Sequence, residues 1–597
     1  MSVKSPMYAL DRHASGRGRI ASIHALPTEI LSYVFELVTH GLSRDEQQVV
    51  GVGQQRLPFH PSCVTSPITL SAVNRRWRYV GLTTPTLWTS ICVSIDRRPL
   101  GVDSALDAEG LACFLLRSRT CPIDILIDAR DPEWEFPDFS DPLQSGSSAT
   151  QHPFHLHLIT QTLDILLHHV TRWRSLTILT DTWAPMHAAV TRLSRPPGPT
   201  ASNHGGFPGD AMRGAACLET LTLMHCNEYI VQGDGFNMDG QGDDDDLKEG
   251  AILTPFAALF GYGRDAARDL NCHRLSRLRS LSLLGVPVNW ARLSSLVGDT
   301  WMCGRGLSGE SIQMLELSYL ECRVRPRVAD FCRMLRGCRS LRSLSLMRSG
   351  LLQDEDEDEG ASEGGHGQTQ VDLQSLEKMH LAYDTVLDAI RILALLHCSN
   401  LKVLEMEQVV SPDSLASEDA SLLLTYCSTG LLSKPKDLDA TIESQKRRRP
   451  HFALLEELTL HHVTARDAGS YAVLFGCLPN LRRLTLRHTP VCAIASLLPR
   501  QIFCDGEDWC DGDGDDPEGR VCAPCVRLTC LEVTHVDVRA YHLLGFTLKE
   551  RGRIGAPPIG EVEFCLDVGS AGWLPTPAVG IDNSTYKEIT HLRVVDE

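Results

Sequence analysis

A six-residue pattern with apolar residues at its first, fourth and sixth places recurs along this chain from residue 173 to its end. Start-to-start intervals between copies run from 25 to 60 residues. Self-similarity of this kind predicts one supersecondary unit repeated along the chain, because a single unit cannot bury its own apolar face. The copies are "WRSLTI" (173), "LETLTL" (218), "LRSLSL" (278 and 341), "IQMLEL" (312), "LEKMHL" (376), "LKVLEM" (401), "LEELTL" (455), "LRRLTL" (481), "LTCLEV" (528), "IGEVEF" (559) and "ITHLRV" (589).

The best-defined unit shows what each copy is expected to form. In "LRRLTLRHTPV", Leu484 and Leu486 alternate with polar residues, which is the period of a strand with one buried side. The preceding "ARDAGSYAVLFGCLPN" has apolar residues at helical spacing, and Pro479-Asn480 marks a turn between the two segments. Helix, turn and strand in repetition predict a parallel sheet on one face and helices on the other.

The shorter intervals lie near the leucine-rich-repeat unit of about 20–29 residues. We therefore predict an α/β fold in which residues 96–597 form an irregular leucine-rich-repeat solenoid of stacked units. The strand-like stretches "LWTSICVSI" and "CPIDILID" are interpreted as its first strands. Segments rich in acidic residues, Gly, Pro or Ser are predicted to be disordered insertions, at about 232–250, 353–370, 410–450 and 504–525.

The charge of the chain is concentrated in three acidic segments. The 57 basic and 75 acidic residues of the 597-residue chain give a net charge of −18. The segments Asp243–Asp246, Asp354–Glu359 and Asp505–Glu518 hold as many acidic residues as that net charge, so the remainder is near neutral. A basic field for nucleic acid or anionic lipid is therefore absent, and neither is a predicted partner. "KRRR" at Lys446–Arg449 is interpreted as a solvated loop rather than a nuclear-import signal.

Targeting features favour a cytoplasmic or nuclear location. The first 20 residues lack the apolar run of a signal peptide, and no apolar stretch approaches the length of about 18 residues that spans a membrane. The 21 cysteines are scattered, many within apolar stretches such as "LACFLL". This usage is typical of buried thiols in a reducing compartment. We expect a soluble intracellular protein with no membrane partner.

Four cysteines form the strongest candidate for a metal site. Cys504, Cys510, Cys522 and Cys525 have the spacing C-x5-C-x11-C-x2-C, and the last pair matches zinc-binding spacing. The first spacing is long, and the acidic residues of the loop would raise thiol pKa values. We therefore predict no metal and no cofactor. Nucleophile and metalloprotease motifs are also absent from the sequence, so a non-catalytic protein is expected.

The N-terminal region contains a second kind of segment. In "HALPTEILSYVFELV", Pro27 is suited to the start of a helix, and Ile30, Leu31, Val34, Phe35 and Val38 form an apolar stripe. A polar, Gly-rich stretch separates it from "ITLSAVNRRWRYVGLTTPTLW", in which Leu70, Val73 and Trp77 are expected on one helical face.

This ordered set resembles the F-box family. The matching residues are Leu26, Pro27, Glu29, Ile30, Leu31, Val34, Phe35, Leu70, Val73, Asn74, Trp77, Pro85, Leu87 and Trp88. The continuation with "FLLRSRTCPIDILID" and "HHVTRWRSLTIL" is similar to the large F-box family of mushroom-forming fungi. The resemblance predicts a helical F-box over residues 21–95 after a disordered segment at 1–20. An inserted loop at about 40–66 makes it longer than a compact F-box.

The resemblance implies the substrate-recognition subunit of an SCF-type cullin–RING ubiquitin ligase. By family position, Leu26, Pro27, Ile30, Leu31 and Val34 would contact the Skp-type adaptor, and Trp77 would pack within the F-box. The alternative is a leucine-rich-repeat scaffold that engages no ligase. A zinc-dependent enzyme would need an open metal site with a base beside it.

The repeats would then bind an unidentified target protein. On the side of the strands opposite the leucines, the candidate contacts are Met224, Met347, His461, Arg483 and Arg487. Apolar and basic residues at such positions suit a protein partner. The competing interpretation is that they are ordinary solvated strand positions.

Overall fold

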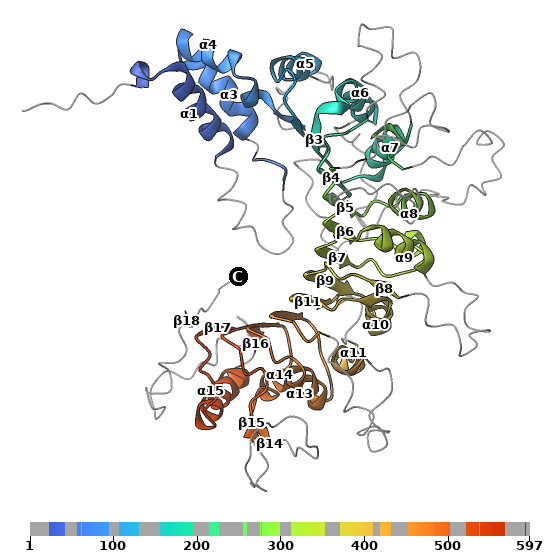
Figure 1. Cartoon of the computed structure of the whole chain (residues 1–597), viewed down its shortest axis with the longest axis vertical. Helices are drawn as coiled ribbons and strands as arrows, with labels where there is room; N and C mark the ends of the chain where they lie inside the picture. The colour runs from blue at the N-terminus through green and yellow to red at the C-terminus, as the bar shows by residue number, and fades with distance from the viewer. Residues whose placement is uncertain are drawn as a thin grey trace, which may run out of the picture. The chain divides into compact units, whose positions relative to one another are not determined.

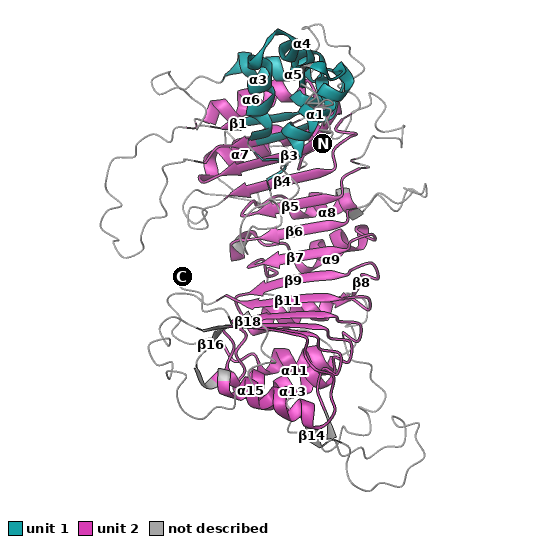
Figure 2. Cartoon of the chain, turned by 90° about the vertical axis from the view of Figure 1, so that its left-hand side faces the viewer, with its two compact units in different colours: residues 1–93, 107–126 teal, residues 94–106, 127–597 magenta. Residues whose placement is uncertain are grey.

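A computed structural model describes most of the helices and strands that these patterns predict. The described residues are 23–41, 57–60, 62–94, 107–130, 154, 156–195, 214–225, 255–259, 275, 277–298, 312–352, 370–409, 418–430, 452–501, 521–536, 538–566 and 591–592. The chain divides into two compact units, of which unit 1 comprises residues 1–93 and 107–126, and unit 2 residues 94–106 and 127–597 (Figure 2). None of the described helices combines the length and the apolar character that crossing a membrane requires. The segments predicted to be disordered at 1–20 and 232–250 lie outside the described residues.

Unit 1 is mainly helical. Its described elements are the 3-10 helix η1 (Ile23–Ala25), α1 (Thr28–His40), α3 (Ser62–Val73), α4 (Arg75–Thr83), the 3-10 helix η3 (Pro85–Trp88), β1 (Ser90–Ser94), α5 (Ala108–Arg117) and β2 (Ile123–Asp128). The last residue of β1 and the last two residues of β2 belong to unit 2. Helix α5, which the sequence assigned to the repeats, groups with these elements. The insertion predicted at 40–66 is wrong at its far end, because α3 begins at Ser62 and buries Cys63 and Val64.

A small apolar core holds unit 1 together. Leu31, Phe35, Val80, Leu87 and Trp88 are each at most 1% exposed and form one cluster. The Trp88 indole nitrogen donates to the Gly81 carbonyl at 2.8 Å, so its buried polar atom is satisfied. Trp77 packs against this cluster, as expected, with its ring centroid 5.0 Å from that of Phe35.

The second helical segment is divided in two at Asn74. Asn74 has extended backbone angles (φ −160°, ψ 174°), and its side chain accepts a hydrogen bond from the Trp77 amide at 2.9 Å. This is the geometry of an N-cap, so α4 begins a new helix after α3. The prediction that Leu70, Val73 and Trp77 share one helical face is therefore wrong, since Trp77 lies on a different helix from the other two.

Unit 2 carries a strand at every copy of the six-residue pattern. The strands are β3 (Trp173–Thr180), β4 (Thr220–His225), β5 (Ser280–Leu284), β6 (Met314–Ser318), β7 (Ser343–Met347), β9 (Lys378–Tyr383), β11 (Val403–Gln408), β12 (Glu457–His461), β13 (Arg483–Arg487), β16 (Cys530–Val536), β17 (Glu561–Leu566) and β18 (His591–Leu592). They pair in this order as one parallel sheet. The predicted parallel α/β repeat is thus confirmed.

The fourth and sixth places of the pattern form two continuous apolar rows across the sheet. The register aligns Leu458 with Leu484 and Leu531, and Leu460 with Leu486 and Val533. These side chains are at most 1% exposed. Because parallel strands lie about 4.8 Å apart, equivalent positions meet in every neighbouring pair and exclude water along the whole sheet.

Helices cover the side of the sheet on which these rows lie (Figure 1). They are α6 (Leu156–Leu167), α7 (Trp183–Ser194), α8 (Trp290–Gly298), α9 (Val328–Gly337), α10 (Val386–Leu395), α11 (Ser421–Thr429), α13 (Ala468–Gly476), α14 (Val491–Ala495) and α15 (Val538–Arg553). Two short strand pairs lie outside the main sheet, namely β8 (Val371–Asp372) with β10 (Leu396–His397), and β14 (Arg500–Gln501) with β15 (Val521–Cys522). The side of the sheet opposite the leucine rows is called the open face below.

Two segments predicted as disordered insertions contain ordered residues. Helix α11 lies inside the predicted insertion at 410–450 and buries Leu423, Leu424 and Cys427. It supplies the helical side of the repeat between β11 and β12, so the prediction is wrong for residues 418–430. The prediction for 504–525 is likewise wrong at its end, where β15 leads to the buried Cys525.

Candidate functional site

The open face gathers the residues that the sequence proposed for target binding. Strand register places Met224 beside Leu284, Met347 beside Ala382, and His461 between Glu407 and Arg487. Met224, Met347, His461 and Arg487 therefore occupy equivalent places in the last row of the open face, although 263 positions separate the first from the last. Arg483 lies on the same face, four residues before Arg487 and exposed.

Ionisable side chains concentrate on the open face of β9 to β16. On strands β3 to β5, the open-face positions before the last row carry uncharged hydroxyl side chains, namely Ser175, Thr220, Thr222, Ser280 and Ser282. Further along the sheet the same face carries His380, Glu405, Glu407, His461, Arg483, Arg487 and Glu532. The C-terminal half of the face therefore offers both signs of charge in fixed positions.

Glu407 is held between two histidines of neighbouring strands. One carboxylate oxygen, Oε1, lies 3.1 Å from Nδ1 of His461, and the other, Oε2, lies 3.9 Å from Nε2 of His380. The hydrogen bond from His461 holds the pKa of Glu407 below its ordinary value and outweighs the opposing effect of burial. Glu407 is therefore an anion at neutral pH and orients the His461 ring.

Glu532 organises the neighbouring basic residues. Arg487 donates to its carboxylate at 2.9 Å, and the Thr485 hydroxyl donates to the other carboxylate oxygen at 3.3 Å. Thr485, although an open-face residue, is only 3% exposed. Arg483 donates to Cys530 Sγ at 3.2 Å and is exposed.

Several strands end in a residue with left-handed backbone conformation. The φ angles are +64° at Gly285, +56° at Tyr319, +50° at Arg348, +54° at His462 and +49° at His488. Each of these residues donates its backbone N–H to a carbonyl at the end of the next strand, at 2.7–3.2 Å. The left-handed position thus turns the chain out of the sheet while keeping the backbone donor satisfied.

This strand ending brings three histidines together. In an extended strand His461 and His462 would point to opposite faces, but the left-handed conformation of His462 breaks that alternation. The rings of His461 and His462 stack with centroids 4.6 Å apart, and those of His462 and His488 stack at 4.2 Å. His461, His462 and His488 are called the histidine cluster below.

The histidine cluster was not predicted from the sequence, although a signal for it was present. "LTLHH" and "LTLRH" place His462 and His488 at the same position of consecutive repeats. Aligning the repeats would have predicted that the two rings are neighbours, because adjacent strands are in register. The participation of His461 depends on the local backbone turn, which the alignment does not reveal.

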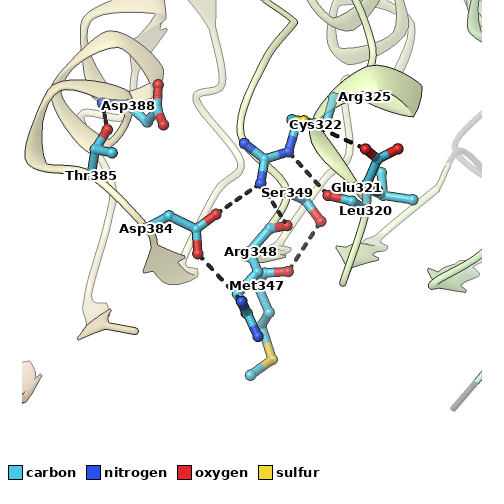
Figure 3. Close-up of polar contacts among 10 residues, drawn as sticks. All are labelled: Leu320, Glu321, Cys322, Arg325, Met347, Arg348, Ser349, Asp384, Thr385 and Asp388. Atoms are coloured by element: carbon cyan, nitrogen blue, oxygen red, sulfur yellow. Dashed lines mark hydrogen bonds and ion pairs between the residues drawn. The ribbon is translucent and has the colours of Figure 1, made fainter. Parts of the chain in front are cut away.

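A second polar network links strand ends nearer the middle of unit 2 (Figure 3). Asp384, just after β9, accepts from Arg325 at 2.8 Å and from Arg348 at 3.3 Å. Arg325 also donates to the Leu320 carbonyl at 3.0 Å and reaches the Arg348 carbonyl at 3.5 Å. The network joins the segments after β6, β7 and β9, so it is a structural clamp with satisfied charges.

A polar pocket of about 400 Å³ lies at the opposite ends of these strands. Its lining includes Gln313, Arg342, Glu377 and Lys402. Glu377 and Lys402 approach to 3.6 Å across it, while each keeps nearly half of its side chain exposed. The pocket therefore contains charges of both signs, of which Glu377 and Lys402 form an ion pair.

Unit 1 places the proposed adaptor-binding residues in different environments. Ile30 is 48% exposed and Pro27 is also exposed, whereas Leu26 and Val34 are half-buried. Leu31 is fully buried in the core of unit 1, so it has no surface for a partner in this structure. The exposed apolar side of α1 also contains Tyr33, Leu37 and Val38, at 58%, 51% and 45% exposure.

Among the four candidate zinc ligands, the described residues fix the side chain of Cys525 alone. Its thiol donates to the Phe475 carbonyl at 3.3 Å, and burial raises its pKa to about 12. Arg551 holds this segment by donating to the carbonyls of Pro524 and Cys525, at 2.6 and 3.2 Å. Cys525 is therefore a protonated core thiol, while Cys504, Cys510 and the side chain of Cys522 lie outside the description.

Comparison with known proteins adds no assignment to these sites. A scan against models of protein families found no match to the chain. A search of curated proteins likewise found no significant relative.

Proposed function

We propose that this protein is the substrate-recognition subunit of an SCF-type ubiquitin ligase. In this proposal unit 1 binds a Skp-type adaptor, the open face of unit 2 binds a target protein, and the chain itself performs no catalysis. Support comes from the ordered F-box-like residues between Leu26 and Trp88, which lie on α1, α3, α4 and η3 or directly beside them. A repeat array following them is the arrangement that the family resemblance implies.

The observation that carries the proposal is the second apolar side of α1. Leu31 and Phe35 fill the core of unit 1, while Ile30, Tyr33 and Leu37 remain about half exposed at spacings of three and four residues. A helix that has already filled its own core has no internal need for a second stripe. These side chains are already about half buried, so covering them with a partner contributes on the order of 1 kcal/mol each.

The adaptor surface is therefore assigned to one side of α1. Ile30, Val34 and the N-terminal Leu26 and Pro27 remain in it, and Tyr33 and Leu37 extend it. Leu31 supports the surface from beneath, because its side chain belongs to the internal cluster. This division separates variants that remove binding from variants that unfold unit 1.

A matched pair of leucine variants tests the adaptor surface. Leu37 on α1 and Leu387 on α10 have nearly equal exposure, 51% and 54%, and each lies on a helix. We expect Leu37→Asp to weaken binding of a purified Skp-type adaptor at least about tenfold, because apolar burial is replaced by a desolvated charge. Leu387→Asp should leave the affinity unchanged, as measured by calorimetry with full-length protein.

Three further outcomes complete this test. Leu31→Ala should lower the stability of unit 1 by about 2–5 kcal/mol, because it opens a cavity in the core. An unchanged affinity in Leu37→Asp and Ile30→Asp would remove α1 as the docking surface. A wild-type chain that binds no adaptor would exclude the ligase and leave the scaffold alternative.

The target side is tested on the open face. Proteins that accumulate in cells lacking this chain are the candidate targets. Re-expression of the wild type should restore their turnover, whereas Arg483→Glu should not, since Arg483 is an exposed cation of the charged half. Restored turnover by Arg483→Glu would place target binding elsewhere.

A further inference from the structure

We propose that the histidine cluster binds one divalent transition-metal ion of the Zn²⁺ type. His461, His462 and His488 each contribute a ring nitrogen, and these three atoms all lie within 4.8 Å of one another. The site is separate from the proposed adaptor surface and from the cysteine segment that the sequence suggested for zinc.

The backbone brings the three rings close together. His462 and His488 hold equivalent places after β12 and β13, where both are left-handed. The rings of His462 and His488 are nearly parallel, at 9°, and the ring of His461 is tilted by 28° to that of His462. The centroids of His461 and His488 are 5.6 Å apart, so the three rings form a compact group rather than an extended ladder.

Glu407 provides the second observation that points to a metal. Its Oε1 lies 3.1 Å from Nδ1 of His461, so the proton of the neutral imidazole is held on Nδ1 and the lone pair on Nε2. Histidines that bind metals commonly donate their other ring nitrogen to a carboxylate, which fixes the ring and raises its basicity. The carboxylate also places a negative charge beside the site.

The donor set selects the class of ion. Imidazole nitrogens suit Zn²⁺, Ni²⁺ and Cu²⁺, whereas Mg²⁺ and Ca²⁺ prefer oxygen ligands. A tetrahedral Zn²⁺ with Zn–N of about 2.0–2.1 Å needs ligand nitrogens about 3.3 Å apart. All three rings are partly exposed, so side-chain rotation can bring them to that distance and leave a fourth position for water.

Arg487, the cation next to the histidine cluster, already forms an ion pair. Arg487 is the strand neighbour of His461 and would repel a metal ion if its charge were free. Its guanidinium is paired with Glu532 at 2.9 Å, which directs that charge to the next strand. The negative charge of Glu407 is therefore not offset by Arg487, and the net charge beside the cluster favours binding of a cation.

Titration of the full-length protein with Zn²⁺ and Co²⁺ tests the proposal. The informative variant is His462→Asn/His488→Asn, because asparagine tolerates the left-handed backbone while removing two ring ligands. The control is His397→Asn, which removes an exposed histidine on β10 outside the cluster. We expect the double variant to lose one equivalent of Zn²⁺ and the control to lose none.

Two further measurements separate this site from cysteine sites. Bound Co²⁺ should lack thiolate charge-transfer absorption, and Cys522→Ser/Cys525→Ser should keep the equivalent that the histidine variant loses. Glu407→Gln should weaken that equivalent about 10–100-fold, as expected for a carboxylate that orients a ligand. Equal Zn²⁺ stoichiometry and affinity in wild type and the histidine double variant would overturn the proposal and leave the cluster as stacked rings only.

Discussion

Individual residues at the strand ends show that the repeat tolerates different side chains in a left-handed backbone conformation. Tyr319, Arg348, His462 and His488 all adopt the left-handed conformation that glycine adopts most readily. Each residue costs roughly 1 kcal/mol in this conformation, which the backbone hydrogen bond to the next strand offsets. The conformation alone therefore does not require glycine at Gly285.

Gly285 is instead required by its surroundings. A Cβ atom at this position would lie 2.6 Å from the His225 carbonyl oxygen, which is backbone and cannot rotate away. We expect Gly285→Ala to destabilise the protein by about 2 kcal/mol, from the left-handed strain and the clash together. The matched change Gly545→Ala, within α15 and with open space around it, should stabilise by about 0.5–1 kcal/mol.

Urea unfolding followed by circular dichroism measures both glycine variants. A Gly285→Ala protein as stable as the wild type would show that the strand ends shift freely.

At the scale of elements, charged side chains join loops that the sheet itself leaves apart. The Asp384 carboxylate forms ion pairs with Arg325 and Arg348, and the Arg325 side chain is only 12% exposed. Such a clamp is more effective than a surface ion pair, because one partner is already removed from water and makes further hydrogen bonds.

Neutralising Asp384 tests this clamp. We expect Asp384→Asn to lower the free energy of unfolding by about 1–2 kcal/mol, since two charge-assisted hydrogen bonds are lost at a site about one-third exposed. Glu377→Gln is the control, because its ion pair with Lys402 is nearly half exposed on both sides and should contribute less than about 0.5 kcal/mol. Equal effects in the two variants would assign no special role to the network.

Across the whole molecule, buried thiols make the free energy of unfolding depend on pH in the alkaline range. Burial raises the pKa of Cys338, Cys398, Cys427 and Cys525 to about 12 each. The cysteines whose side chains are described are free thiols. Their folded pKa values exceed the ordinary value of about 8.5, so their contribution is complete below that pH and falls as pH rises toward 12.

We therefore expect the urea concentration at the midpoint of unfolding to decrease as the pH is raised from 7.5 to 9.5. The loss should be on the order of 1 kcal/mol for each buried thiol at pH 9.5, because the unfolded chain releases protons that the folded chain retains. Cys398→Ala should show a smaller pH dependence than the wild type. An identical pH dependence in the two proteins would mean that these thiols ionise without unfolding.

The repeat, its strands and the side of each strand that faces the core could all be predicted from local sequence patterns. Twelve copies of one pattern coincide with twelve strands, because alternation in a strand and burial of leucine are local properties that the sequence records directly. For the same reason Met224, Met347, His461 and Arg487 were predicted on one face. The boundaries of the insertions were predicted less accurately, since the composition of α11 is typical neither of the repeat nor of a loop.

The contacts between residues of different repeats could not be predicted from those patterns and are seen in the folded chain. Asn74 caps the N-terminus of α4 and thereby separates it from α3. Leu31 rather than Ile30 fills the core of unit 1, a choice that the sequence leaves open because α1 has apolar residues on more than one side. Glu407, His461 and His488 come from different repeats and meet through strand register, and His462 joins them through a backbone turn. Sequence periodicity specifies the face of a strand, whereas contacts between strands depend on register and on the angles at which each strand ends.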